Sequence, residues 1–149
     1  MKRSRRGSRE FALRGLYQWQ LAGADVTTIA RELAEAQEFG RADPEYFRTL
    51  LAGTVADAPE LEAVITPCLD REFARLSPIE RAILLLAGYE LKHRPEVPFR
   101  VVINEAVELA KSYGGTDGHK YVNGVLNKLA AQLRRTETGA RDEGLGTRG

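Results

Sequence analysis

Residues 76–91, LSPIERAILLLAGYEL, constrain the fold more than any other stretch of this chain. Ser77 and Glu80 have the spacing of a capping box, in which both side chains pair with backbone N–H groups left free at a helix start. Pro78 suits the first helical position, where no N–H group is needed. The apolar residues that follow cover nearly every side of the expected helix. Such a helix must lie at the centre of a bundle.

Helical spacing of apolar residues recurs on both sides of this segment, and no stretch alternates with the period of two that a strand requires. The sequence therefore predicts an all-α bundle of roughly seven helices. In the helix expected over 98–113, the wheel places Tyr113 among the inward residues. The expected helices cover about residues 8–22, 26–38, 44–55, 57–65, 77–93, 98–113 and 117–135.

Catalysis finds little support in the residue types present. The chain lacks the glycine-rich phosphate loop and the dinucleotide fingerprint, and its two histidines, His93 and His119, lie far apart. The single cysteine, Cys68, excludes a disulfide framework and suits a reducing cytosol. No run of 18 apolar residues predicts a membrane span. We therefore expect a cytoplasmic protein that is not an enzyme and needs no cofactor or metal.

Charge is concentrated at the start of the chain. Residues 1–9 carry five cations and no acid, whereas the whole chain of 149 residues has a net charge of +1, so the rest is mildly acidic. Gly7 and Ser8 disfavour a stable helix there. The pattern predicts a flexible basic arm over residues 1–7 that orders on phosphates, although a basic segment is also typical of a plain solvated tail.

The last expected helix carries a second candidate feature. On a helical wheel, the buried stripe passes through Val122 and Leu129, and Tyr121 lies about 100° away from Val122. Asp117 is one turn earlier on the side of Tyr121, and Lys120 points further outward. Two interpretations stay open: a stacking platform for an unpaired base, or a half-buried tyrosine that covers a helix seam.

Four segments together resemble the NusB family of transcription antitermination factors. They are RRGSREFALRGLYQWQL, YFRTLLAGTV, LSPIERAILLLAGYEL and VPFRVVINEAVELAKSYGGTDGHKYVNGVLNKLA. The resemblance implies two packed helical subdomains over residues 8–135. Residues 136–149 carry no apolar stripe, so we expect a disordered tail there. The resemblance also implies binding of the boxA element in nascent ribosomal RNA transcripts together with NusE, a small-subunit ribosomal protein, within an RNA polymerase antitermination complex.

The resemblance also assigns candidate RNA-binding residues. The basic residues of the family fall on Arg5, Arg6 and Arg9, with Lys2 assisting. The aromatic residue of its HK-aromatic-VNG motif falls on Tyr121, and the acidic residue four positions earlier falls on Asp117. The capping-box acid falls on Glu80, as an acceptor for base edges. The outward-pointing Lys120 completes the predicted set.

Two departures from the family and two alternatives remain. Gly7 interrupts what is often an unbroken arginine run, and Cys68 stands where relatives can have an aromatic residue. The same module resembles the N-terminal domain of a ribosomal RNA cytosine methyltransferase, but this chain ends without the α/β domain that such an enzyme needs. The other alternative is a helical adaptor whose basic arm meets acidic proteins, and a homodimer that covers the arm is left open.

Overall fold

The computed structural model describes residues 4–139, so Lys2 and most of the expected tail fall outside the described residues. Within that range the chain forms eight α-helices, short 3-10 turns and no β-sheet. The helices are α1 (Arg5–Ala22), α2 (Val26–Ala34), α3 (Pro44–Ala56), α4 (Ala58–Ile65), α5 (Pro78–His93), α6 (Phe99–Tyr113), α7 (Gly118–Leu133) and α8 (Arg135–Thr138), and the 3-10 turns are η1 (Gln37–Arg41), η2 (Thr66–Cys68) and η3 (Phe73–Arg75).

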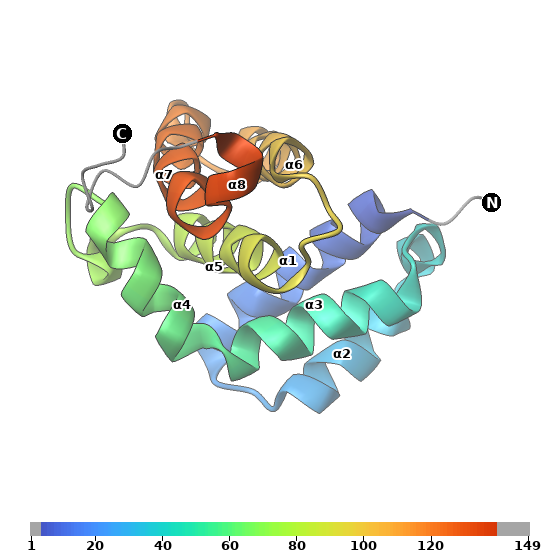
Figure 1. Cartoon of the computed structure of the whole chain (residues 1–149). Coiled ribbons are helices and arrows are strands. Elements are labelled where there is room, and N and C mark those ends of the chain that lie inside the picture. The colour runs from blue at the N-terminus through green and yellow to red at the C-terminus, as the bar shows by residue number, and fades with distance from the viewer. Residues whose placement is uncertain (1–3, 140–149) are drawn as a thin grey trace.

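Helices α1 and α5 run through the middle of the molecule (Figure 1). Helices α2 and α3 pack on one side of them, α6 and α7 pack on the other, and α4 lies against α5 and α7. These two groups of helices share one contiguous hydrophobic core. The predicted all-α fold of two packed helical groups is confirmed. None of the helices within 4–139 is long and apolar enough to cross a membrane.

The predicted central helix is present as α5. The Ser77 hydroxyl accepts a hydrogen bond from the Glu80 N–H group at 3.1 Å, and the Glu80 carboxylate accepts one from the Ser77 N–H group at 3.4 Å. All residues from Ala82 to Gly88 are buried. The expectation of a capped helix enclosed on every side is confirmed, because helices from both groups cover it.

Helix α1 begins at Arg5, three residues before the expected start at Ser8, so part of the predicted arm is helical. Ser4 caps it: its hydroxyl accepts from the Gly7 N–H group at 3.1 Å, and its own N–H group donates to the Arg41 carbonyl at 2.8 Å. Gly7 was expected to oppose a helix here. Instead it lets α1 approach another backbone, since a Cβ at this position would lie 3.0 Å from the Arg41 carbonyl oxygen.

A buried carboxylate joins three helices behind this first turn. Arg9 donates from Nε and Nη2 to the two oxygens of Glu90 on α5, at 2.8 and 2.9 Å. The Tyr46 hydroxyl on α3 donates to the same carboxylate. Arg9 is only 6% exposed and Glu90 only 1% exposed. Arg9, predicted to contact RNA, is therefore an internal ion-pair partner in this structure.

The far end of α5 is closed by a second buried arginine. Arg134, which follows α7, donates to the carbonyl oxygens of Leu91 at 2.8 Å and Arg94 at 3.1 Å. It also donates to the Glu90 carbonyl at 3.2 Å and pairs with Glu137. Carbonyl groups at a helix C-terminus have no partner within the helix, so the arginine supplies what the backbone cannot.

A comparison of Gly7 with a second helical glycine, Gly124, tests the role of Gly7. We expect Gly124→Ala, on the exposed side of α7 with nothing near its Cβ position, to raise the free energy of unfolding by about 0.5–1 kcal/mol. Gly7→Ala gains the same helix propensity but presses a methyl group against the backbone at Arg41, so it should lower stability. Urea denaturation followed by circular dichroism measures both. An equal gain in the two variants would contradict the close approach.

The internal ion pair predicts a large and non-additive effect on stability. Arg9→Met leaves the Glu90 carboxylate buried without its cation, and we expect a loss of roughly 3–5 kcal/mol in the free energy of unfolding. In the double variant with Glu90→Gln that charge is absent, so part of the loss should be recovered. Denaturant titration checks both changes. If Arg9→Met unfolds like the unaltered protein, the pair does not hold these helices.

Candidate nucleic-acid interface

The three arginines at the start of α1 differ in what they can bind. The Arg5 guanidinium lies over the Tyr46 ring, with Cζ 4.0 Å from the ring centroid, and is exposed. No described residue accepts a hydrogen bond from it. Arg6 is also exposed, but its Nε and Nη2 donate to Glu105 on α6 at 3.0 and 2.8 Å. The hydrogen-bond donors of Arg5 are thus available to an anion. Arg6 can bind an anion only if it releases Glu105. Arg9 is buried.

Tyr121 lies in the first turn of α7 and is half-buried. Its hydroxyl donates to the Asp70 carboxylate at 3.0 Å and accepts from the Asp70 N–H group at 3.4 Å. The Arg71 guanidinium covers the ring, with Cζ 4.5 Å from its centroid. The ring also packs against the core. The ring therefore covers a helix seam and stacks on a cation at the surface. Its role as a platform for an unpaired base stays a prediction.

The turn that holds Tyr121 was missed by sequence reasoning. Asp70 and Arg71 lie between η2 and η3, where no helical period marks them, and they pair with each other at 2.7 Å. Hydrogen bonds from Arg71 and then from Tyr121 lower the pKa of Asp70 to about 2. This carboxylate is consequently ionised under physiological conditions. The turn presents a guanidinium plane on which a base can stack in the same way as on the aromatic ring.

The other predicted residues of this patch surround the start of α7. Asp117 and Lys120 are both strongly exposed and pair at 3.5 Å. Asp117 occupies the N-cap position of α7, but its side chain accepts no hydrogen bond from the helix. Glu80 reaches the same place, because its second oxygen lies 3.1 Å from where a Cβ of Gly118 would be. The structure thus brings Glu80, Asp117, Lys120 and Tyr121 together.

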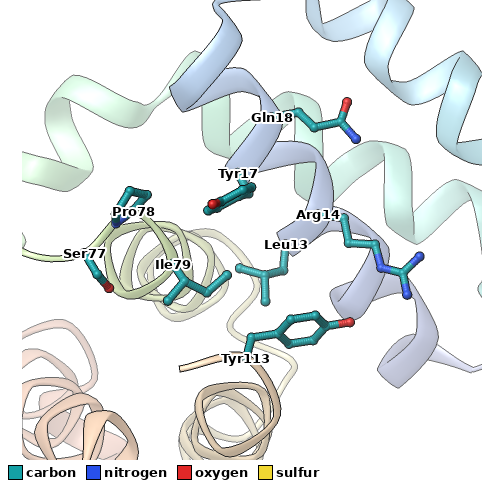
Figure 2. Close-up of a pocket in the computed structure, with 8 residues that line it drawn as sticks. All are labelled: Leu13, Arg14, Tyr17, Gln18, Ser77, Pro78, Ile79 and Tyr113. Atoms are coloured by element: carbon teal, nitrogen blue, oxygen red, sulfur yellow. The ribbon is translucent and has the colours of Figure 1, made fainter. Parts of the chain in front are cut away.

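An open groove of about 550 Å³ separates this patch from the basic end of α1. Figure 2 shows the rings of Tyr17 and Tyr113 on either side of Leu13 and Ile79. Tyr17 is 39% exposed and Tyr113 is 36% exposed. The groove is mostly apolar, and its lining comes from α1, the start of α5 and the end of α6: Leu13, Arg14, Tyr17, Gln18, Ser77, Pro78, Ile79 and Tyr113.

Tyr113 was predicted to face the core, and this prediction is wrong, because the residue is 36% exposed. Because it is the last residue of α6, its side chain leaves the core and its hydroxyl donates to Glu10 on α1. Glu10 also pairs with Arg14 at 3.6 Å. Glu10 follows Arg6 by one turn of α1, so these contacts connect the groove with the basic end. A search for exposed aromatic residues at helix ends would have found this residue.

The groove connects with the Tyr121 patch at its other end. Ser77 lines the groove and is hydrogen-bonded to Glu80, which faces the start of α7. Neighbouring side chains therefore lead from Arg6, one turn before Glu10, past Tyr113 and along the groove to Glu80 and the start of α7, where Tyr121 lies. This surface offers guanidinium groups for phosphates, aromatic rings for stacking and carboxylates for base amino groups. Among the described residues, no three His, Cys, Asp or Glu side chains are grouped to hold a metal ion.

Comparison with known proteins identifies the family of the chain. The chain matches the model of the NusB family over residues 6–131. It is 61% identical to the transcription antitermination protein NusB of Nitrosospira multiformis, over 89% of this chain and 84% of that protein. It is 58% identical to the NusB protein of Thiobacillus denitrificans, over 92% of this chain and 94% of that one.

Two solved structures have the same fold. The NusB protein of T. maritima is 31% identical and superposes with a TM-score of 0.81, covering 89% of this chain and 94% of that chain. A chain from a complex of antitermination factors NusB and NusE with double-stranded RNA is 29% identical, with a TM-score of 0.78 and coverage of 86% and 96%. With its family model matched over most of its length, this chain belongs to the NusB family.

Proposed function

We propose that this chain is a non-enzymatic antitermination factor that binds the boxA element of nascent ribosomal RNA together with NusE, within an RNA polymerase antitermination complex. The observation that carries the proposal is the row of contacts that leads from the first turn of α1, through the groove, to the start of α7. The structure of the related NusB and NusE proteins with double-stranded RNA supports both partners. Membership of an antitermination family supports the role in transcription.

The residues of this surface divide the work by chemistry. Arg5 and Arg6 contact phosphates, and Lys2 adds a further cation from outside the described residues. Tyr121 and the neighbouring Lys120 meet the opposite end of the bound segment. The carboxylates of Glu80 and Asp117 accept hydrogen bonds from the amino groups of bases. Arg9 is left out of this set, because its guanidinium is already bonded to Glu90 inside the protein.

The groove favours unpaired nucleotides over a duplex. Its walls carry two tyrosine rings with apolar side chains between them, and stacking on such rings requires bases that are free of a partner strand. Tyr17 and Tyr113 therefore join the proposed binding set, although neither was among the RNA-binding residues predicted from the sequence. A single strand that lies along the groove would reach the cations at one end and Tyr121 at the other.

Phosphate contacts should make RNA binding depend on salt. Residues 1–6 carry four cations, and Arg9 is buried, so we count four phosphate contacts. At ~−0.7 per contact, the log of the affinity for boxA RNA should fall with log salt at a slope of about −2.8. Arg5→Ala should make the slope less steep by ~0.7. Arg31→Ala, at an exposed arginine on α2, is the matched control and should change nothing. Fluorescence anisotropy at several salt concentrations measures the slope.

The same titration, with boxA and scrambled RNA and with and without NusE, separates the alternatives. Preference for boxA that NusE strengthens supports the proposal. Equal binding of both RNAs beside tight binding of NusE would instead identify a protein adaptor. A slope near zero would remove the basic end from RNA binding.

Stacking of a base at the start of α7 depends on the ring of Tyr121. Tyr121→Ala removes the ring and should weaken RNA binding by about 1–3 kcal/mol, with unchanged helicity. Tyr121→Phe keeps the ring and loses only the hydrogen bonds to Asp70, so it should bind nearly as well as the unaltered protein. Thermal melting accompanies each titration. A Tyr121→Ala variant that melts early and yet binds normally when folded would show that the ring only packs.

A further inference from the structure

A small polar pocket of about 260 Å³ lies at the basic end, outside the groove. It forms where the first turns of α1 and α3 meet the residue that follows α5. Its lining is charged and hydroxylated, in contrast to the apolar groove: Arg5, Asp43, Glu45, Tyr46, Thr49 and Arg94. The surface described above uses only one of these residues, Arg5.

One aromatic ring holds two guanidinium groups at this pocket. The Cζ atoms of Arg5 and Arg94 lie 4.0 and 5.3 Å from the centroid of the Tyr46 ring, within the range of cation–π attraction. The ring itself cannot move freely, because Tyr46 is 4% exposed and its hydroxyl donates to Glu90. Stacking on a fixed ring therefore lowers the entropy that the two arginines lose when they bind an anion at this pocket.

Both arginines keep unused hydrogen-bond donors. Arg5 has no acceptor among the described residues. Arg94 donates one group to Glu96 at 2.9 Å, and its Nε is buried without any partner within residues 4–139. The side chain of Arg94 is 30% exposed, so an anion in the pocket can offer acceptor oxygens to the exposed guanidinium nitrogens of this pair. Guanidinium forks match phosphate oxygens in geometry, which makes phosphate the anion of choice.

The carboxylates of the pocket narrow the ligand further. Asp43 is engaged as the cap of α3, where its oxygen accepts from the Glu45 and Tyr46 N–H groups at 3.1 and 3.2 Å. Glu45 is exposed at the rim and opposes an anion. Beside it, Thr49 adds a hydroxyl. A ligand that pairs a phosphate with hydroxyl donors satisfies both signs of charge, and a ribonucleotide has this combination through its phosphate and 2′-hydroxyl.

We propose that Arg94 and Arg5, both stacked on Tyr46, form a subsite for one phosphodiester of the bound RNA, with Glu45 facing its ribose. This inference rests on the proposed RNA binding and extends the interface around the start of α1, beyond the groove. Tyr46 acts as a positioning residue: it touches no RNA and fixes the two cations.

The test compares charge variants in anisotropy titrations of boxA RNA with the full chain and NusE. Arg94→Gln should weaken binding roughly two- to fivefold, as expected for a partly exposed ion pair. Arg94→Lys, which keeps the charge, should recover part of this loss. Glu45→Gln should act in the opposite direction and strengthen binding, because it removes the charge that opposes the phosphate while its amide oxygen still accepts from the ribose hydroxyl. At low salt the two glutamine variants should shift the affinity in opposite directions, and at high salt both should converge on the unaltered protein.

A double variant shows whether the two arginines share one phosphate. If they do, Arg94→Gln should cost less in the Arg5→Ala background than in the unaltered protein. Equal losses in both backgrounds would overturn the shared subsite, as would unchanged binding by both Arg94→Gln and Glu45→Gln. Thermal melting guards against misfolding, and if Arg94→Gln melts early, Glu45→Gln and Arg94→Lys decide the matter. Failure of the unaltered protein to bind boxA RNA would overturn the proposed function itself, whereas normal binding with inert variants overturns only the subsite.

Discussion

The buried carboxylate of Glu90 is the interaction on which the basic end of this molecule depends. It accepts two hydrogen bonds from Arg9 on α1 and one from Tyr46 on α3, so three helices meet at a single charge. A carboxylate with 1% exposure is very costly to bury unless such partners are present. The helices can therefore pack only in the register that brings these partners together. Burial, followed by the effect of Glu90, raises the pKa of Tyr46, so the phenol stays protonated and keeps donating.

This internal bond determines what the neighbouring arginines can do. The guanidinium of Arg9 is buried and hydrogen-bonded to Glu90, so it is not exposed to a phosphate in this structure. The ring of Tyr46, fixed by the same carboxylate, gives Arg5 and Arg94 a surface on which to stack. Arg5 and Arg9 are one helical turn apart and look equivalent in sequence, yet one is exposed and the other is a core residue. Both side chains lie on the same side of α1, which faces α3 and α5. Arg5 is in the first turn, at the edge of this contact, whereas Arg9 is one turn further in and is enclosed.

The sequence was informative wherever the controlling interaction is local. The capping box needs only Ser77 and Glu80, three residues apart, and it predicted the start of α5 correctly. Gly7 shows the opposite case. Its low helix propensity is real, but the contact that makes a glycine necessary involves Arg41, which is distant in the chain. The Glu90 partner of Arg9 is 81 residues away, so no local pattern could show that Arg9 is buried.

The site was predicted in its chemistry more than in its connections. Tyr121, Glu80 and Asp117 do lie together, because Glu80 packs against the start of α7. The groove that joins them to the arginines was not visible, since it is built from three helices. The wheel failed for Tyr113 because a residue at the last position of a helix has no following turn to enclose it. Asp70 and Arg71 lie in an irregular turn, where periodicity carries no information.

Carboxylates along the proposed RNA-binding surface are counterproductive only if the cations are considered alone. Glu105 holds Arg6, Glu10 holds Tyr113 and Arg14, and Asp70 holds Arg71 and Tyr121. Each acid fixes a side chain that would otherwise lose conformational freedom on binding, so the surface is ordered in advance. Each acid also weakens attraction to any phosphate chain that brings no other contact. On the proposed function, a strand must therefore offer bases to the groove and to Tyr121 in order to compete with Glu105 for Arg6. Phosphate attraction and base stacking are in this way made to depend on each other, which is how a surface with few exposed cations can distinguish one RNA segment from another.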